Sequence, residues 1–195
     1  MIPTLNHPLG MPYARRLQYL ASTGTQYIDT GIAPDYANGD SIEIHLYGAG
    51  FSGAAPCAFG SRESGVLNGI YLLGTNNLIV CDTAGNTGIG FLASAPTELS
   101  LTVNDSTATA NGTSYTMPRH VTVGLPIYLF ALNNYGTGTF GIYSGMKLYD
   151  WKYYRNGKLA QHLIPVLDKS GVPCLYDTVS RTMKRNAGTG SFDYA

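Results

Sequence analysis

The chain has 195 residues, of which 12% are charged, and its 12 basic and 12 acidic side chains give a formal net charge of zero. Without a basic excess to neutralise phosphates, the composition argues against nucleic acid as a partner. The 24 glycines and 15 tyrosines are typical of many short strands joined by tight turns. The length suits one domain with a sizeable core.

Residues 1–16 (MIPTLNHPLGMPYARR) contain three prolines, which favour an extended segment over a helix. This stretch lacks the basic and apolar regions of a signal peptide, and no apolar run is long enough to span a membrane. We therefore expect no signal peptide and no membrane segment. We interpret residues 1–16 as an extended arm that docks on a neighbouring subunit, with a frayed terminus as the alternative. The domain would then comprise residues 17–195.

Short apolar runs bounded by Gly, Asn and Ser follow the arm, and we expect a strand at each. Residues 41–47 alternate cleanly, with Ile42, Ile44 and Leu46 on one face. A short strand is expected from Leu17, followed by a turn and a strand through Tyr27 and Ile28. Further strands are expected at 57–60, 70–73, 78–81, 99–103, 113–117 and 126–132, the last apolar on both faces and therefore central in a sheet. Turns are expected at 76–77, 104–105 and 111–112, and residues 133–139 form a polar, Gly-rich loop.

The strongest local signal is a hairpin across Asn156-Gly157, within residues 141–166. Asn and Gly both tolerate the positive φ angles of a two-residue type I′ turn. We expect Tyr149, Trp151 and Tyr153 to share one face of the first arm. A buried core and a ligand-binding aromatic face are the two interpretations of that face. On the second arm Leu159, Leu163 and Val166 carry the apolar content, and Pro165 predicts a strand end or edge.

Regular turn spacing without helical periodicity predicts an all-β fold, either a two-sheet antiparallel sandwich or a barrel. Two segments carry a resemblance to a known family: LQYLASTGTQYIDTGI near the start, and residues 147–192, which contain LYD and NAGTGSF. They resemble the ends of a concanavalin A-like (laminin G-like) jelly-roll domain, of a subgroup frequent in phages and prophages of gut bacteria. The resemblance covers residues 17–192 and is weaker in the middle third. It implies a two-sheet jelly roll with adjacent terminal strands that binds carbohydrate or protein, or serves as a virion structural module.

Catalytic and metal-binding patterns are absent from the sequence. The related glycosidases carry several acids at alternate positions of one strand, whereas residues 41–47 supply only Glu43 beside His45. Asp29, Asp35 and Asp40 lie among turn residues, where Asp caps loops locally. No nucleophile elbow surrounds Ser144. The four histidines (His7, His45, His120 and His162) lack metal-ligand spacing, so we expect surface or hydrogen-bonded side chains and no catalytic or metal-ligating residues.

Two further groups of residues could bind a metal or form bonds. Cys57, Cys81 and Cys174 have no paired spacing, so we expect buried, reduced thiols without metal. Ca²⁺ stays possible because laminin G-like domains often hold it at the sheet rim with loop oxygens. The loop residues that could supply such oxygens are Asp82, Asn86, Asn104, Asp105, Asn133 and Asn134. Turn formation is the alternative explanation of these residues.

We expect a non-catalytic phage virion structural protein: a capsid decoration, fibre or tail-associated subunit of a virion that is assembled in the cytoplasm of the host bacterium. Its partners would be other virion subunits, reached through the arm, and we expect a homo-oligomer. It would also adhere to host or mucosal glycans through Asn133, Asn134 and Tyr135, because loops on a rigid sandwich usually carry such contacts. A free carbohydrate-binding module of a gut bacterium is one alternative, and a glycoside hydrolase is the other.

Overall fold

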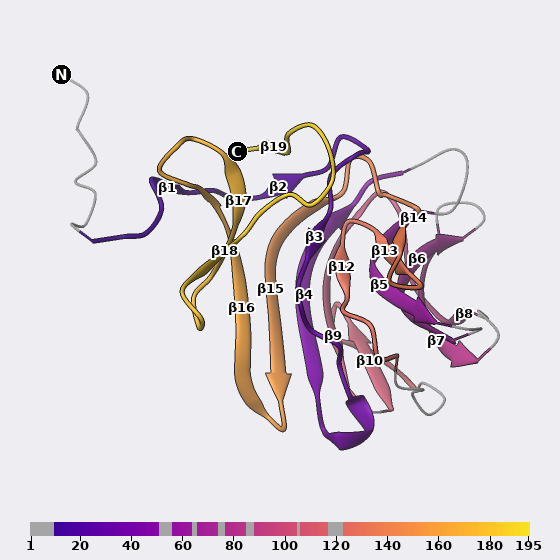
Figure 1. Ribbon diagram of the computed structural model, residues 1–195. Coiled ribbons are helices and arrows are strands. Elements are labelled where there is room, and N and C mark those ends of the chain that lie inside the picture. Colours follow the sequence, from indigo (N-terminus) through magenta and orange to yellow (C-terminus); the bar gives the residue numbers. More distant parts are fainter. Residues whose placement is uncertain are drawn as a thin grey trace.

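The computed structural model describes residues 10–50, 56–63, 66–73, 77–84, 88–104, 106–116 and 123–195, with the backbone alone along the strands between 66 and 92. These residues form two β-sheets that face each other (Figure 1). Their one helical element is the 3₁₀ turn η1 (Tyr36–Asn38). No helix in this part of the chain is long and apolar enough to cross a membrane. The expected all-β, jelly-roll-like sandwich is confirmed.

The larger sheet, sheet A, has eleven strands and the smaller, sheet B, has eight. Sheet A consists of β1 (Arg15–Arg16), β2 (Leu20–Ala21), β4 (Ser41–Gly48), β9 (Thr97–Val103), β10 (Thr107–Ala110), β11 (Thr113–Thr116), β15 (Lys147–Arg155), β16 (Lys158–Leu167), β17 (Pro173–Asp177), β18 (Thr182–Lys184) and β19 (Asp193–Tyr194). Sheet B consists of β3 (Ile28–Asp29), β5 (Cys57–Glu63), β6 (Val66–Leu73), β7 (Asn77–Ala84), β8 (Gly88–Ser94), β12 (Tyr128–Leu129), β13 (Leu132–Asn134) and β14 (Gly138–Phe140). Neighbouring strands are antiparallel, except that β13 runs parallel to β5.

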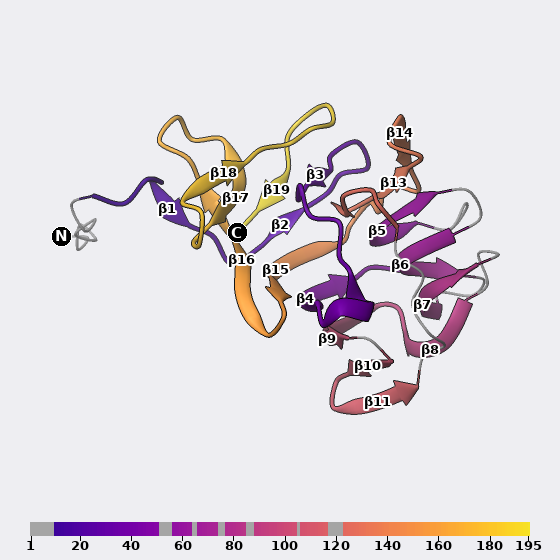
Figure 2. The ribbon, with the colours of Figure 1, turned by 60° about the horizontal axis from the view of Figure 1, so that its bottom comes forward.

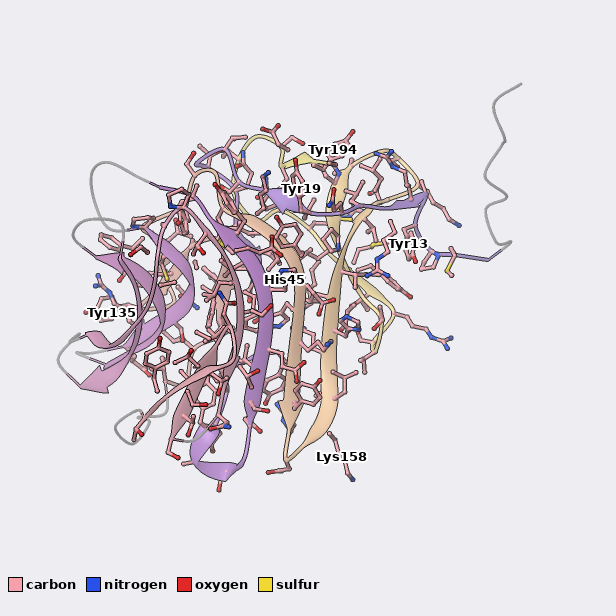
Figure 3. All side chains as sticks on the ribbon, turned by 180° about the vertical axis from the view of Figure 1, so that it is seen from behind. Tyr13, Tyr19, His45, Tyr135, Lys158 and Tyr194 are labelled. Atoms are coloured by element: carbon pink, nitrogen blue, oxygen red, sulfur yellow. The ribbon has the colours of Figure 1, made fainter. Side chains whose placement is uncertain are left out.

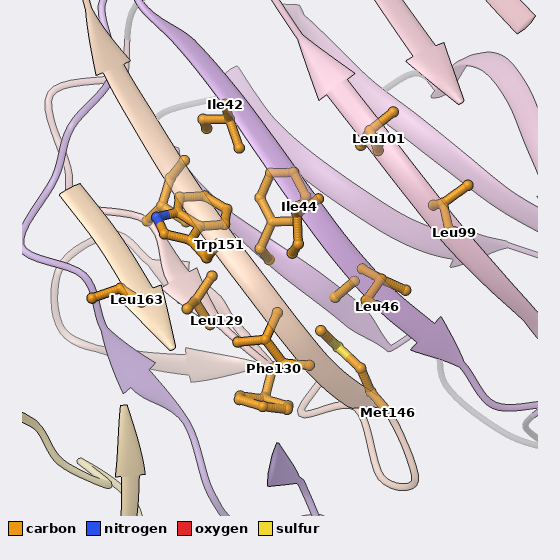
Figure 4. Close-up of a cluster of buried hydrophobic side chains, with 14 of the residues drawn as sticks. Ile42, Ile44, Leu46, Leu99, Leu101, Leu129, Phe130, Met146, Trp151 and Leu163 are labelled. Carbon is orange, nitrogen blue, oxygen red and sulfur yellow. The ribbon is translucent and has the colours of Figure 1, made fainter. Parts of the chain in front are cut away.

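The core fills the space between the sheets, as Figure 4 shows. Strand β4 buries Ile42, Ile44 and Leu46, which confirms the alternation expected for this strand. Trp151 of β15 is fully buried and meets Phe59 of sheet B edge-on, with ring centroids 5.3 Å apart. Its indole N–H donates to Gln161 Oε1 over 3.2 Å, so the one polar atom of the ring is paired. Trp151 is therefore a core residue, and the ligand-face interpretation of this side chain is wrong.

The hairpin of β15 and β16 turns at Asn156-Gly157 as expected, with φ of 50° and 72° at the two turn residues. The expected common face of its aromatics is wrong in one respect. A β-bulge at Tyr149, between Leu148 and Asp150 in the pairing with β4, shifts the alternation by one residue. Leu148, Trp151 and Tyr153 therefore point inward, whereas Tyr149 lies on the outer face and stacks on His45, with centroids 4.6 Å apart.

The second arm of the hairpin also differs from expectation. Leu159 is exposed, whereas Leu163 and Val166 are buried, on opposite faces of β16. Pro165 lies inside β16, opposite Leu175 of β17, rather than at a strand end. It stands where β16 changes partner, since β15 pairs with β16 up to Leu163 and β1 takes over at Val166. This change of neighbour replaces the sheet edge that proline usually needs.

The apolar run at residues 126–132 is not one continuous strand. Phe130 has a φ of 68°, which separates β12 from β13. Because of this kink, Leu129 and Phe130 are both fully buried although they are adjacent in sequence. The run is thus apolar throughout because a kink turns successive side chains inward. Both pieces still lie inside sheet B, β12 between β3 and β5 and β13 between β14 and β5.

The two motifs that carry the family resemblance pack against each other. Strand β19 pairs with β2, so the terminal strands are adjacent, as the resemblance implies (Figure 1). Thr189 N donates to Thr25 O over 3.1 Å, and Ala187 N donates to Tyr27 O over 2.9 Å. Gly188 sits so close to this turn that an added Cβ would lie 2.1 Å from Thr25 O. The NAGTGSF and STGTQYIDTG segments therefore form one interlocked unit.

Residues 10–16 of the expected arm lie against the protein's own sheet, so that part of the arm prediction is wrong. Arg15 and Arg16 pair with Leu167 and Val166 as strand β1. Tyr13 packs on Tyr176, with ring centroids 5.3 Å apart, over a small apolar cluster on the outer side of β16 and β17. Residues 1–9 lie outside the described residues.

The remaining sequence expectations fall partly within the described residues. Cys57 and Cys174 are buried as expected, whereas the side chain of Cys81 lies outside the description. The second Asn-Gly hairpin forms between β10 and β11, with Asn111 at a φ of 48°. The turns expected at 76–77 and 104–105 each include an undescribed residue, as does the end of the strand expected at 113–117.

Candidate functional site

The sequence-predicted glycan residues lie on the β13–β14 hairpin, at one end of sheet B (Figure 2). Side chains alternate along β13, so Asn133 and Asn134 point to opposite faces of the sheet. Asn133 is only 1% exposed, whereas Asn134 is half-buried on the outer face and Tyr135 is 47% exposed. Asn133 therefore cannot touch a ligand on the outer face, while Asn134 and Tyr135 can.

Asn133 instead shapes the turn that presents Tyr135. Its side-chain N–H donates to Pro126 O over 2.9 Å, and its Oδ1 accepts the N–H of Gly136 over 3.1 Å. Tyr135 N donates to Arg62 O over 3.1 Å, which ties the turn to β5. Tyr135 itself adopts a φ of 58°, in the left-handed region that bulky residues rarely occupy. The hairpin thus holds an exposed tyrosine in an unfavourable backbone conformation.

Two residues that the sequence analysis did not single out complete the group. Arg62 of β5 donates from Nε to Asn134 Oδ1 over 2.5 Å. Its guanidinium carbon lies 5.2 Å from the ring centre of Tyr135 and 5.1 Å from that of Phe140, which is 42% exposed. Both distances are within the range of a cation–π contact. We call Arg62, Asn134, Tyr135 and Phe140 the rim platform.

The outer face of sheet B carries a second aromatic pair beside the rim platform. Tyr128 of β12 stacks on Tyr27, with ring centroids 4.8 Å apart. Tyr128 is opposite Gly60, which precedes Arg62 by two residues on the same face of β5. Two residues of strand span roughly 7 Å. Aromatic rings and polar groups therefore continue along this face from the rim platform toward β12.

The calcium hypothesis finds no support at this hairpin. The side-chain oxygen of Asn133 accepts a backbone N–H, and that of Asn134 accepts an N–H from the cationic Arg62. A guanidinium beside the oxygen repels a divalent cation. Among the described residues, no group of three His, Cys, Asp or Glu side chains converges. Asn104 uses its backbone N–H to close a turn onto Thr107 O, and Asp82, Asn86 and Asp105 lie outside the described side chains.

The outer face of sheet A carries the acidic residues considered for catalysis. A hollow of about 300 Å³ lies over β4, β9, β10 and β15 and is lined by Glu43, His45, Asp150 and Lys152, among others. Lys152 Nζ lies 3.1 Å from Glu43 and 3.8 Å from Asp150, and it separates the two carboxylates. Tyr154 also donates to Glu43, over 3.2 Å. The hydrogen bond to Glu43 raises the pKa of Lys152, so this lysine stays charged between the two acids.

Both described histidines are hydrogen-bonded, as expected. His45 Nε2 lies 2.6 Å from Glu98, and His162 Nε2 lies 2.8 Å from Asp150. His7 and His120 lie outside the described residues. The turn acids are also bonded locally: Asp29 accepts the N–H of Gly31 over 2.8 Å, and the buried Asp40 accepts the N–H of Asp35 over 2.8 Å. These contacts give each of these acids a structural partner.

The sequence contained weak signals for the missed residues. Arg62 is the one lysine or arginine in residues 41–117, where the other charged side chains are acids, and its cross-strand partners are Leu67 and Asn134. That observation needs the strand register, which sequence patterns do not provide. Phe140 directly follows the Gly-rich loop that contains Tyr135, and four residues separate the two aromatics in a stretch that predicts a turn.

Comparison of the sequence with protein-family models finds no match, and a search of curated proteins finds no relative. The concanavalin A-like assignment therefore stays a resemblance carried by the terminal motifs. The all-β sandwich and the adjacent terminal strands agree with it. Function on such a sandwich must be argued from its site, because one fold hosts many functions.

Proposed function

We propose that this protein is a non-catalytic binding module that recognises glycans through the rim platform. The observation that carries the proposal is a pair of exposed rings, Tyr135 and Phe140. Their centres lie 5.2 Å and 5.1 Å from the guanidinium carbon of Arg62, which is hydrogen-bonded to the Asn134 amide. Sugars bind shallow sites by stacking their C–H faces on aromatic rings while amides and guanidinium groups bond the hydroxyls. The rim platform offers both kinds of group at one place.

The backbone conformation of Tyr135 supports the proposal independently. A non-glycine residue in the left-handed region costs about 1–3 kcal/mol, and such strain gathers at functional sites. At Tyr135 the strained backbone holds a large ring in solvent, and an exposed ring adds nothing to the stability of the fold. Binding a ligand is a physical reason for retaining the strained conformation.

The absence of catalysis is part of the proposal. The two acids that Lys152 contacts on the outer face of sheet A, Glu43 and Asp150, are held by Lys152, Tyr154 and His162. A glycosidase needs one carboxylic acid to exchange a proton and a second group to act on the sugar. Lys152 Nζ lies 3.1 Å from Glu43 and 3.8 Å from Asp150, so both carboxylates are engaged by a cation of the protein itself.

We also propose, from the family resemblance, that the module is part of a phage virion and that virion subunits are its protein partners. Mass spectrometry of purified particles tests this proposal separately from glycan binding. We expect the protein to be present in purified particles in stoichiometric amounts. A gene neighbourhood of polysaccharide-degrading enzymes without virion genes would instead indicate the free bacterial module.

Glycan-array screening followed by calorimetry tests the rim platform. Tyr135→Asn removes the ring but keeps a residue that tolerates the left-handed conformation. We expect this change, and Phe140→Ala, each to weaken binding about 3- to 10-fold, as for the loss of one ring contact. Tyr194→Ala is the matched control, because Tyr194 is also 42% exposed with an arginine, Arg15, 5.9 Å from its ring. Tyr194 lies far from Tyr135 (Figure 3).

Two results would count against the proposal. One is the absence of glycan binding by the wild-type protein. The other is equal loss of binding in Tyr135→Asn and Tyr194→Ala. Release of reducing sugar that disappears in Glu43→Gln would contradict the non-catalytic part alone.

A further inference from the structure

The guanidinium of Arg62 is held in place but keeps most of its hydrogen-bonding capacity. An arginine has five N–H donors. Nε–H is bonded to Asn134 Oδ1, and among the described residues no acceptor bonds the terminal nitrogens. Arg62 is half-buried, and two aromatic rings lie about 5 Å from its guanidinium carbon. The group is therefore oriented, partly shielded from water, and still able to bind.

Two other cations of the described structure, Arg185 and Lys152, have the acidic partner that Arg62 lacks. Arg185 Nη1 lies 2.5 Å from Asp168, and Lys152 pairs with Glu43. No described acid pairs with Arg62, because the adjacent Glu63 lies on the opposite side of β5 and accepts the N–H of Gly124 over 3.3 Å. A cation that is partly withdrawn from water gains most from an anionic partner that reaches it.

We infer that the rim platform binds a saccharide that carries a carboxylate or a sulfate, and that Arg62 bonds this anionic group. The inference rests on the proposed glycan binding and specifies its ligand class. The planar guanidinium fork matches two oxygens of a carboxylate or sulfate, a geometry that a lysine cannot provide. Tyr135 and Phe140 would stack on the ring that carries the acid, and Asn134 fixes the guanidinium through Nε.

The sandwich offers a reason why the charge is placed at this point. Only 12% of the residues are charged and the net charge is zero, so the overall charge of the chain does not attract anions. Selection between acidic and neutral sugars then depends on one local cation. A close, partly shielded contact is also less sensitive to salt than long-range attraction.

Matched pairs of saccharides test the inference. The probes are oligogalacturonate against its methyl ester, 3′-sialyllactose against lactose, and a chondroitin sulfate oligosaccharide against its desulfated form. For whichever saccharide pair binds, we expect the anionic member to bind at least about tenfold more tightly, because hydrogen bonds between two charged groups are stronger than those to a neutral group. The carboxylate and sulfate pairs distinguish the two sources of charge.

Variants of Arg62 assign the effect to this residue. Arg62→Met removes the charge and keeps an unbranched apolar side chain, so we expect the anionic and neutral probes to bind equally. Arg62→Lys keeps the charge without the fork and should lose most of the preference. It also provides the test if Arg62→Met does not fold. Arg15→Met is the control, because Arg15 also lies near a tyrosine ring, and its strand β1 is far from β13 and β14 (Figure 1).

The outcomes separate this inference from the proposed function. Equal binding of neutral and anionic probes by the wild type, lost in Tyr135→Asn, overturns the anionic class and leaves glycan binding standing. Failure of every probe overturns both. Inorganic sulfate that competes as strongly as the sulfated oligosaccharide, at matched ionic strength, also overturns the inference, because the site would then bind a free anion without its sugar.

Discussion

Gly188 provides the sharpest test of how the chain ends are joined. An added Cβ would lie 2.1 Å from Thr25 O and 3.1 Å from Thr25 C, and both are backbone atoms. Real Cβ atoms essentially never approach closer than 3.0 Å, so the turn of residues 186–190 must move by about an ångström or detach. No side chain can rotate to relieve this contact. Gly188→Ala therefore tests the interlocked motifs directly.

The expected cost follows from the contacts around the turn. Overpacking a tight site costs about 1–3 kcal/mol. Detachment would break the bonds from Ala187 N to Tyr27 O and from Thr189 N to Thr25 O, each worth about 1 kcal/mol net. We expect Gly188→Ala to lower the free energy of unfolding by about 2–4 kcal/mol. For a chain of this size, that corresponds to a fall in Tm of roughly 5–15 °C.

Urea and thermal unfolding, followed by circular dichroism and by Trp151 fluorescence, measure the effect. Two other glycines separate its causes. Gly138→Ala meets nothing within 4 Å and should change stability by less than about 0.5 kcal/mol. Gly157 has open space but a φ of 72°, so Gly157→Ala should cost about 1 kcal/mol from backbone strain alone. The reasoning is refuted if Gly188→Ala is no less stable than Gly157→Ala.

Three further predictions concern buried and paired groups. Trp151→Ala should lower the free energy of unfolding by about 3–5 kcal/mol, and native tryptophan fluorescence should resist quenching by iodide, because the ring is fully buried. Burial raises the pKa of the Cys174 thiol to about 11, so mass spectrometry should find Cys174 unmodified by iodoacetamide at pH 8 in native protein and modified in urea. Backbone N–H groups, chiefly that of Val172, and then Arg185 hold the pKa of Asp168 below its usual range. The stability from this depressed pKa is present above the ordinary Asp pKa of about 4 and is lost as pH falls through the folded-state value, so Asp168→Asn should flatten the acid side of the pH–stability profile.

The sequence predicted the parts of the fold that depend on local pattern. The Asn156-Gly157 and Asn111-Gly112 turns form because their residues accept positive φ, and β4 alternates because one of its faces is buried. Predictions failed where a local irregularity changed the alternation. The bulge at Tyr149 and the kink at Phe130 each move a side chain to the other face without any change in composition. Such irregularities arise from pairing with distant strands, which periodicity cannot reveal.

The candidate site was predicted only in part, for the same reason. Asn134 and Tyr135 were found because turn residues and an aromatic occur together in one loop. The burial of Asn133 required knowledge of which face of β13 is inside. Arg62 is 72 residues from Asn134, and their contact depends on the parallel pairing of β5 with β13. A parallel register between distant segments leaves no short-range trace in the sequence.

Most buried polar side chains and strained backbone positions of the described structure have a structural explanation. The buried polar side chains Asp40, Gln161, Asp168 and Asp177 each have hydrogen-bond partners. Of the other described non-glycine residues with positive φ, two are asparagines in hairpin turns, Phe130 fills the core, and Arg181 lies in an exposed turn where its N–H donates to Asp177 O over 2.8 Å. Tyr135 differs because its strained backbone exposes an aromatic ring beside a cation that no described acid neutralises. Neither feature stabilises the sandwich, and the two coincide at a single hairpin. Unfavourable features that coincide in this way are expected where a ligand supplies the missing interactions.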